Sequence, residues 1–381
     1  MSCRRLRAEN LGAECSRMCL FGPIVGRRNS ILRWNKMWTF NICNDWNTIS
    51  SPQYVAWWKN LLDTSLTSHV FYHPTLVKAW IETYSPLRNM TPFFISGVDA
   101  DSGNEVFFPM IVWRRNWKHI WLKIALPVGF SDYDYHDPIF RVMPSDVGLF
   151  WNELVSLLKT YDFDKVIIDG IKEHLVYKDE NWHRNEPCPY LNLSNIQNED
   201  QLLMFFKSSL RGDIRRQIRR MNEIGEVSLK EYSFFDEAKI TFQKFIQEHS
   251  LRWPHAYKAP YFHQNMLVEG LNSIVHFSSL NIGRVAVAWH LGFEYDGVYY
   301  YYMPAGDHSY SNLSPTKIHL YFLIRRAIEK GYKIFDHLRG EENYKQGFSN
   351  GLDYVNSLTI NNQSLGSEIK NGIEKIISKL R

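Results

Sequence analysis

Residues 283–350 constrain the fold more than any other part of the sequence, because they predict strands and a helix in a fixed order. Residues 285–293 and 298–303 are rich in apolar, β-branched and aromatic side chains, as strands are. The pair Asp296-Gly297 between them is typical of a tight hairpin turn. This stretch therefore predicts two adjacent antiparallel strands.

A helix and a third strand follow this hairpin. Ser314 offers a hydroxyl that can cap a helix, and Pro315 suits the first helical position, where a missing N–H group has no consequence. Apolar residues then recur at helical spacing, namely Leu320, Leu323, Ile324 and Ala327. Gly331 ends the helix before the short apolar strand 333–335. The order strand, strand, helix, strand indicates an α/β unit.

Polar residues follow the third strand at once, with the spacing D-x-x-R-G-E-x-x-Y-K over residues 336–345. This segment resembles the GNAT-like acyltransferases of the cellulose-biosynthesis (CelD) and FemAB-like branch. Besides that spacing, the resemblance rests on Gly283-Arg284, the strand end 299–304, Ser314-Pro315, the basic stretch 210–225 and the stretch 132–140. It spans residues 52–354.

The resemblance implies an α/β (α+β) fold with two tandem GNAT-like units, each a mixed sheet flanked by helices. It also implies transfer of an acyl group to an amine or hydroxyl, from acyl-CoA or, in the Fem group, from aminoacyl-tRNA. The glycine-rich pyrophosphate loop of ordinary acetyltransferases is absent before the helix at Pro315. The sequence therefore leaves the acyl donor open.

Length and composition agree with two domains of ordinary size, since the chain has 381 residues, of which 45% are hydrophobic. The formal charge of +4 does not by itself imply a nucleic-acid partner. The five cysteines form no CxxC pair, so neither a zinc site nor a disulfide framework is predicted. No apolar run reaches the length of a membrane span. We therefore expect a cytoplasmic protein with reduced thiols.

The order of patterns divides the chain into three parts. Residues 1–36 are predicted to be a loose basic tail, residues 37–190 an N-terminal GNAT-like domain, and residues 191–381 a C-terminal GNAT-like acyltransferase domain. Both domains show strands, a helix and a closing strand, which suggests duplication. Residues 187–198, rich in proline, asparagine and serine, are the predicted linker between them.

A single amphipathic helix is predicted over residues 200–224, with five arginines beside its apolar stripe: Arg211, Arg215, Arg216, Arg219 and Arg220. One interpretation is a solvated flank of the helix. The other is a surface that contacts phosphate, because guanidinium groups bind phosphate oxygens in pairs. The candidate ligands are CoA, a sugar nucleotide and tRNA.

Residues near the start of the predicted helix are candidates for binding acyl-CoA. Free N–H groups and the helix dipole favour anions at a helix N-terminus, and Ser314, Thr316 and Lys317 add two hydroxyls and a cation. The alternative is that Ser-Pro is simply a good helix start. Backbone N–H groups near Met303, where the aromatic strand is expected to break before Pro304, are candidates for polarising the thioester carbonyl.

Asp336 is the first candidate for the general base, because it stands at the carboxyl end of a strand predicted to be buried. Glu341 and His290 are the alternatives, although a lone strand histidine is more often structural. Arg339, Tyr344 and Lys345 are candidates for binding the acceptor. Four further polar residues lie close together in sequence, namely Asp132, Asp134, His136 and Asp137. Their interleaved tyrosines favour a turn lining the acceptor cleft over a metal site.

These observations predict an N- or O-acyltransferase that uses acyl-CoA (acetyl-CoA) and no metal. The family resemblance alone suggests a saccharide or amino-sugar acceptor, a role in envelope or exopolysaccharide synthesis, and envelope-synthesis proteins as partners. Two alternatives remain open. One is a Fem-like transferase that uses charged tRNA, and the other is a non-catalytic GNAT-like module that partners a polysaccharide synthase.

Overall fold

The computed structural model describes residues 37–381 except 118–119, 178, 180, 272 and 380–381, and Met37–Arg381 forms one compact unit. The predicted tail, residues 1–36, lies outside the described residues. The first half contains β1 (Trp38–Cys43), α1 (Trp46–Ile49), α2 (Pro52–Thr64), α3 (Pro74–Tyr84), β2 (Met90–Asp99), β3 (Glu105–Trp117), β4 (Ile120–Pro127), β5 (Ile139–Phe140), α4 (Val147–Leu158) and β6 (Lys165–Lys172).

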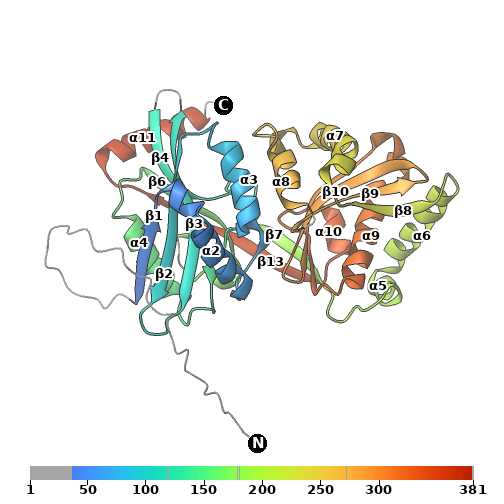
Figure 1. Cartoon of the computed structure of the whole chain (residues 1–381), viewed down its shortest axis with the longest axis horizontal. Helices are drawn as coiled ribbons and strands as arrows, with labels where there is room; N and C mark the ends of the chain where they lie inside the picture. Colours follow the sequence, from blue (N-terminus) through green and yellow to red (C-terminus); the bar gives the residue numbers. More distant parts are fainter. Residues whose placement is uncertain (1–36, 118–119, 178, 180, 272, 380–381) are drawn as a thin grey trace, which may run out of the picture. The chain divides into compact units, whose positions relative to one another are not determined.

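The remaining elements complete the fold (Figure 1). They are β7 (Trp182–Asn192), α5 (Glu199–Phe205), α6 (Ser208–Asn222), β8 (Val227–Tyr232), α7 (Phe235–Arg252), α8 (Phe262–Gly270), β9 (Val275–Ile282), β10 (Val285–Tyr295), β11 (Val298–Gly306), α9 (Pro315–Glu329), β12 (Ile334–Asp336), α10 (Asn343–Gly347), β13 (Gly351–Asn361) and α11 (Leu365–Lys379).

One mixed sheet repeats the same unit twice, as the sequence predicts. In the first half β2, β3 and β4 are antiparallel neighbours, α4 follows, and β6 pairs with β4 in parallel. In the second half β9, β10 and β11 are antiparallel neighbours, α9 follows, and β12 pairs with β11 in parallel. The fold is therefore α/β, with two tandem GNAT-like units.

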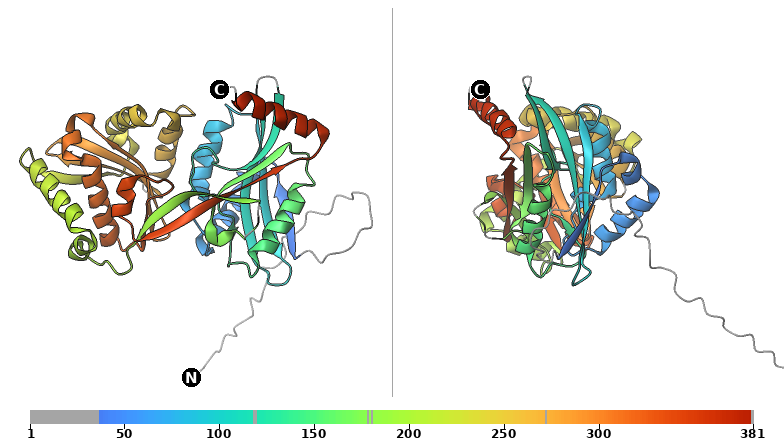
Figure 2. Two further views of the ribbon diagram at one scale, coloured as in Figure 1. Left: turned by 180° about the vertical axis from the view of Figure 1, so that it is seen from behind. Right: turned by 90° about the vertical axis from the view of Figure 1, so that its left-hand side faces the viewer.

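Strands β7 and β13 connect the two halves of the sheet. β7 pairs with β12 of the second half, and β13 pairs with both β7 and β6 of the first half. Figure 2 shows these two strands side by side through the middle of the molecule. The predicted linker was wrong in its first part, because residues 187–192 belong to β7. The predicted domain boundary at residues 190/191 stays a prediction.

Helices cover both faces of the second half of the sheet. α5, α6 and α9 pack on the face that carries Tyr299 and Tyr301. α7 packs on the other face, which carries Trp289 and Tyr300 and whose core extends into the first half. The alternation of strand side chains between two apolar layers explains why these strands are apolar along their whole length.

Two local predictions were wrong. The single helix over residues 200–224 is instead α5 and α6, separated by extended backbone at Phe206 and Lys207. The break lets Phe206 bury its ring against Phe348, a contact distant in sequence. The strand expected to break before Pro304 continues to Gly306, with Pro304 opposite His290 in the antiparallel ladder with β10.

Three findings concern the chemistry available to the described part of the chain. Cys43 and Cys188 are free thiols. Among the described residues, no three or more His, Cys, Asp or Glu side chains are placed to hold a metal ion. None of the helices described is both long enough and apolar enough to cross a membrane.

Candidate active site

The candidate site forms where β11 and β12 part. These strands pair only over Val298–Tyr300, and Tyr300 faces Asp336, the last residue of β12. β11 then continues to Gly306, while the chain after Asp336 turns away into the segment 337–345. The opening between the two segments leaves one side of β11 without a strand neighbour, so main-chain groups there are available to a ligand.

A pocket of about 890 Å³ occupies this opening. It is lined by the end of β11, the start of α9, the segment 337–345, the end of α7 and the turn at residues 131–134. Seven predicted site residues line it, namely Met303, Ser314, Thr316, Lys317, Arg339, Tyr344 and Lys345. The pocket therefore brings together residues from both halves of the chain.

The start of α9 differs from the prediction. Ser314 adopts a left-handed conformation (φ 53°), and its side chain makes no capping hydrogen bond to the helix. The N–H groups of Lys317 and Ile318 both donate to the Ser314 carbonyl, at 3.1 and 3.2 Å. Because Pro315 has no N–H group, Thr316 carries the one N–H of this turn that has no acceptor among the described residues. The helix start thus offers an anion fewer donors than expected.

Gly306 permits a close approach between β11 and α9. A Cβ atom at Gly306 would lie 2.8 Å from Cγ2 of Thr316, closer than side-chain atoms approach one another in proteins. A glycine therefore lets the strand end lie against the helix start. This contact holds Thr316 at the wall of the pocket.

Lys317 is paired within the protein. Its Nζ lies 2.8 Å from Asp213 Oδ2, and Asp213 on α6 also accepts a hydrogen bond from Arg216. Arg215 and Arg219, on the same helix, are exposed and form no ion pair with the described part of the chain. The basic surface of α6 therefore lies next to the pocket through the Asp213 contact, with two arginines available to solvent anions.

Asp336 is buried and does not line the pocket. Its Oδ1 accepts hydrogen bonds from the Tyr135 hydroxyl at 2.9 Å and from the Leu338 N–H at 2.8 Å. Burial raises the pKa of Asp336, while the positive charge of Lys172 opposes that rise. These contacts fix the turn after β12, where Leu338 has a φ of 60°.

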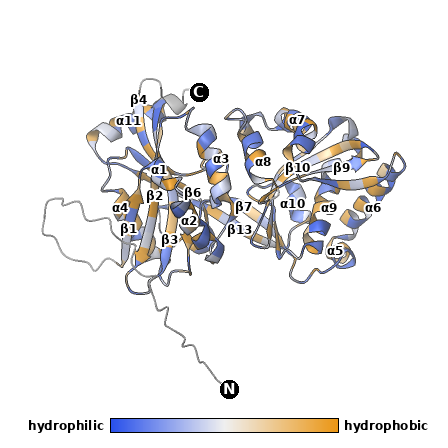
Figure 3. Cartoon of the chain, in the orientation of Figure 1, coloured by the Kyte–Doolittle hydropathy of each residue, from blue (hydrophilic) through white to orange (hydrophobic). Residues whose placement is uncertain are grey.

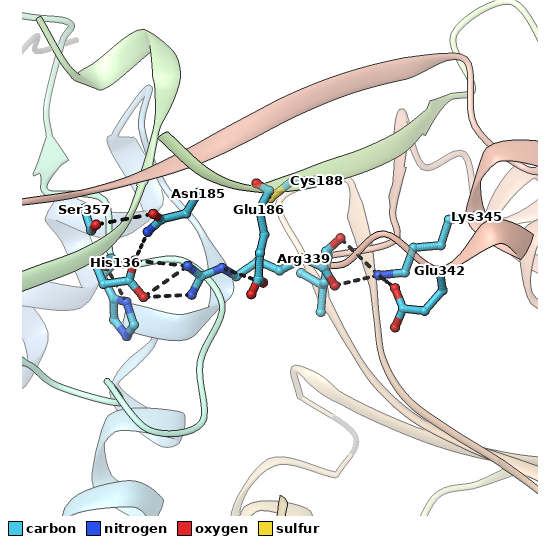
Figure 4. Close-up of polar contacts among 10 residues, drawn as sticks. His136, Asn185, Glu186, Cys188, Arg339, Glu342, Lys345 and Ser357 are labelled. Carbon is cyan, nitrogen blue, oxygen red and sulfur yellow. Dashed lines mark hydrogen bonds and ion pairs between the residues drawn. The ribbon is translucent and has the colours of Figure 1, made fainter. Parts of the chain in front are cut away.

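Arg339 and Lys345, predicted to bind the acceptor, also make internal contacts (Figure 4). The guanidinium of Arg339 donates to both carboxylate oxygens of Asp169 on β6, at 3.0 and 3.1 Å. Lys345 Nζ donates to the Arg339 carbonyl at 2.6 Å and lies 2.9 Å from Glu342 Oε2. Tyr344 and Lys345 lie in the short helix α10. Both cations are thus held rigidly at the pocket wall.

Asp134 is a carboxylate in the pocket that is open to a ligand. It is half-buried, and no described residue donates a hydrogen bond to its carboxylate. Its neighbour Asp132, by contrast, accepts hydrogen bonds from Trp80 and Tyr84, each at 2.9 Å. Burial raises the pKa of Asp134 to about 7, with Asp336 adding to the rise and Arg339 and Lys345 opposing it. This value suits a general base at neutral pH.

The pocket also excludes the other two predicted catalytic residues. His290 is completely buried, its ring stacks on Tyr301, and burial lowers its pKa well below the usual value. Glu341 is exposed outside the lining residues. Their roles, like those of the other site residues, stay predictions.

Residues that the catalytic prediction did not include also line the pocket. Arg252, Trp253 and His255 follow the end of α7, and Lys258 donates to the Ser131 carbonyl at 2.7 Å. His337 donates from Nε2 to the Phe348 carbonyl at 3.1 Å, and its buried Nδ1 has no partner in the described structure. The Arg252-Trp253 pair before Pro254 is the only signal in the sequence that points to this wall.

Residues 208–346 match the family model described as an acetyltransferase (GNAT) domain. The chain is similar in structure to FemX, with a TM-score of 0.59 and 10% identity over 83% of this chain and 98% of FemX. It is also similar to a conserved protein of unknown function from Bacteroides thetaiotaomicron, with a TM-score of 0.50 and 10% identity over 80% of this chain and 97% of that one. No curated protein matches the sequence. Residues 208–346 are thus similar to an acetyltransferase (GNAT) domain, and the two structures support the fold.

Proposed function

We propose that the chain transfers the acyl group of acyl-CoA, for example acetyl-CoA, to an amine or hydroxyl of a saccharide or amino-sugar precursor in envelope or exopolysaccharide synthesis. We place it in the CelD and FemAB-like branch of GNAT acyltransferases. The observation that carries the proposal is the pocket of about 890 Å³ at the parting of β11 and β12, two strands of the segment that matches the GNAT domain.

The donor side of the pocket fits a phosphorylated carrier. Thr316 and Ser314 contribute hydroxyls, Thr316 an N–H group and Lys317 a cation, all at the pocket wall. Main-chain groups near Met303, on the unpaired side of β11, are suited to polarise a carbonyl. A bound acyl-CoA would supply an activated thioester carbonyl. At the start of α9, Thr316 carries the one N–H group that has no acceptor among the described residues, so a phosphate finds fewer donors there than in a glycine-rich loop.

On the acceptor side, Asp134 is the base that the pocket favours. An acceptor amine or hydroxyl bound beside Asp134 would give its proton to the carboxylate as it attacks the carbonyl carbon. Arg339 and Lys345 stabilise the ionised carboxylate, and Tyr344 offers a hydroxyl and an aromatic face to a sugar ring. Asp336, the base predicted from the sequence, is the alternative. It lies behind the pocket wall, where its carboxylate accepts hydrogen bonds from Tyr135 and Leu338.

A Fem-like transferase that uses aminoacyl-tRNA is the second candidate. The observation in its favour is the exposed arginine pair Arg215 and Arg219 on α6, whose neighbour Asp213 contacts Lys317 at the pocket. Guanidinium groups on one helix face suit the phosphates of a nucleic acid. Deacylated tRNA is therefore the second ligand to test, beside acetyl-CoA.

The donor is tested by calorimetric titration of the purified protein with acetyl-CoA and, separately, with deacylated tRNA. The proposal expects acetyl-CoA to bind with one-to-one stoichiometry and tRNA to bind weakly, with a strong dependence on salt. Binding of tRNA without binding of acetyl-CoA would favour the Fem-like function. Binding of neither would favour a non-catalytic module.

A further inference from the structure

The last helix of the chain, α11, attaches to the body through its polar side. Ser367 Oγ donates to Asp164 at 2.6 Å, and Lys370 Nζ donates to the same carboxylate at 3.0 Å. Glu374 accepts a hydrogen bond from Arg115 at 3.2 Å and one from Lys165 at 2.8 Å. Three charged or hydroxyl side chains of the helix are thus used to hold it in place.

The apolar side of α11 faces solvent. Four large side chains recur at helical spacing and are exposed: Leu365 (75%), Ile369 (55%), Ile373 (37%) and Ile376 (62%). Figure 3 shows hydrophobic and hydrophilic segments alternating along this helix. A surface helix of a globular protein normally turns its apolar side to the core and its polar side to water. α11 has the reverse orientation, which indicates that another apolar surface covers it.

The charge around this face restricts what can cover it. Residues 365–381 contain four basic residues and two acidic ones. Glu374 is paired with Arg115 and Lys165, and Lys370 is paired with Asp164, so three basic residues and one acidic residue of the segment are left to set its charge. The surroundings are therefore positive. Residues 1–36 contain eight basic and two acidic residues, so like charge disfavours that segment as the cover.

The size of the face argues against a second copy of the chain. α11 has 15 residues and is about 22 Å long at about 1.5 Å per residue. A strip about 10 Å wide along it covers roughly 220 Å², whereas a stable protein complex buries about 800 Å² on each partner. A lipid surface needs no such area, because an amphipathic helix binds it through a few apolar side chains and nearby cations.

We propose that the apolar face of α11 docks on an anionic lipid surface, with Leu365, Ile369, Ile373 and Ile376 entering the boundary between headgroups and acyl chains. The net positive charge of residues 365–381 favours anionic headgroups over neutral ones. Trp121, which is 56% exposed on β4, the strand that α11 contacts, adds an aromatic side chain suited to the same interface. The protein is then a peripheral membrane protein held by one helix.

Co-sedimentation of the full chain with vesicles tests this proposal. Vesicles of phosphatidylglycerol and phosphatidylcholine in equal parts are compared with vesicles of phosphatidylcholine alone. We expect the wild type to sediment with the anionic vesicles and to be released at high salt, because salt screens the attraction to the headgroups. The double variant Ile369→Asn/Ile376→Asn should bind at least about tenfold more weakly.

The matched control is Ile240→Asn, which changes an isoleucine that is 81% exposed on α7. Both variants should keep the melting temperature of the wild type, since they alter exposed side chains. Equal sedimentation of the double variant and the control would overturn the proposal, as would equal binding of the wild type to neutral vesicles. A wild type that ignores vesicles but self-associates in the ultracentrifuge, with a monomeric double variant, would assign the face to a second copy.

Discussion

The availability of Asp134 to a ligand depends on which hydrogen-bond donors surround each aspartate of the turn. The pattern of Asp132, Asp134 and Asp137 predicts a turn at the acceptor cleft, but it does not say which carboxylate is available. The structure separates them by their partners: Asp132 accepts hydrogen bonds from two aromatic side chains, Asp137 accepts one from the Lys172 N–H, and Asp134 faces the pocket. Such partners lie far apart in sequence, so no local pattern reveals them.

Replacing Asp134 by asparagine should lower kcat/KM for acyl transfer by about 10²- to 10⁴-fold, the usual contribution of a general base. In the wild type, kcat/KM should rise with pH up to about 7 and then level off, because the pKa of Asp134 is raised to about 7 and the ionised form is the base. The asparagine variant should lose this rise. Steady-state kinetics between roughly pH 5 and pH 9 provide the measurement.

The matched variant is Asp336→Asn. An asparagine oxygen can still accept the hydrogen bonds from Tyr135 and Leu338, so we expect this variant to keep the rise near pH 7. If the pH dependence disappears in Asp336→Asn and survives in Asp134→Asn, Asp336 is the base and the assignment to Asp134 is wrong.

Lys345 is expected to contribute to stability as well as to the site. It is 3% exposed, and its Nζ contacts the Arg339 carbonyl and Glu342. Lys345→Ala should lower the free energy of unfolding by about 1–3 kcal/mol, because it leaves buried acceptors without a donor. Urea denaturation followed by circular dichroism measures this change. An unchanged midpoint would show that the contacts of Lys345 do not stabilise the fold.

At the scale of elements, the hairpin β10–β11, helix α9 and strand β12 are predictable from sequence, because turn residues and apolar periodicity act locally. The break between α5 and α6 is not, since it depends on Phe206 packing against Phe348. The left-handed conformation of Ser314 is likewise not indicated by the Ser-Pro pair, which is typical of an extended N-cap. The continuation of β11 past Pro304 depends on its pairing with β10, in which Pro304 lies opposite His290.

Lys317→Ala should weaken acetyl-CoA binding about two- to fivefold, since a partly exposed ion pair contributes up to about 1 kcal/mol. The effect should shrink at high salt. Lys330→Ala, at the opposite end of α9, is the control and should leave the affinity unchanged. Calorimetry that finds equal affinities for the wild type and both variants would exclude Lys317 from the donor site.

At the scale of the whole molecule, buried neutral histidines link stability to pH. Burial lowers the pKa of nine of them from the ordinary value of 6.5: His69, His73, His136, His249, His263, His276, His290, His319 and His337. The unfolded chain takes up these protons near pH 6.5, whereas His69 and His337, with pKa values of about 3, resist protonation in the fold. This stability is therefore complete above pH 6.5 and is lost as the pH falls.

Three aspartates act in the opposite direction, because burial raises the pKa of Asp134 and Asp137 to about 7 and also raises that of Asp336. Their protonation in the fold favours folding as the pH falls. Since nine buried histidines outnumber them, the melting temperature should drop between about pH 7 and pH 5. Differential scanning calorimetry across this range checks the sign. A melting temperature that rises on acidification would contradict the neutral state of the histidines.

The central claim is acyl transfer from acyl-CoA in the pocket between β11 and β12, and a transfer assay tests it most directly. Acetyl-CoA is incubated with the wild type and a panel of amino sugars and sugar nucleotides, thiol release is followed, and products are identified by mass spectrometry. We predict release that depends on the acceptor, an acetylated saccharide, and loss of both in Asp134→Asn with the fold intact. Release of no thiol with any acceptor, together with transfer from aminoacyl-tRNA, would contradict the account.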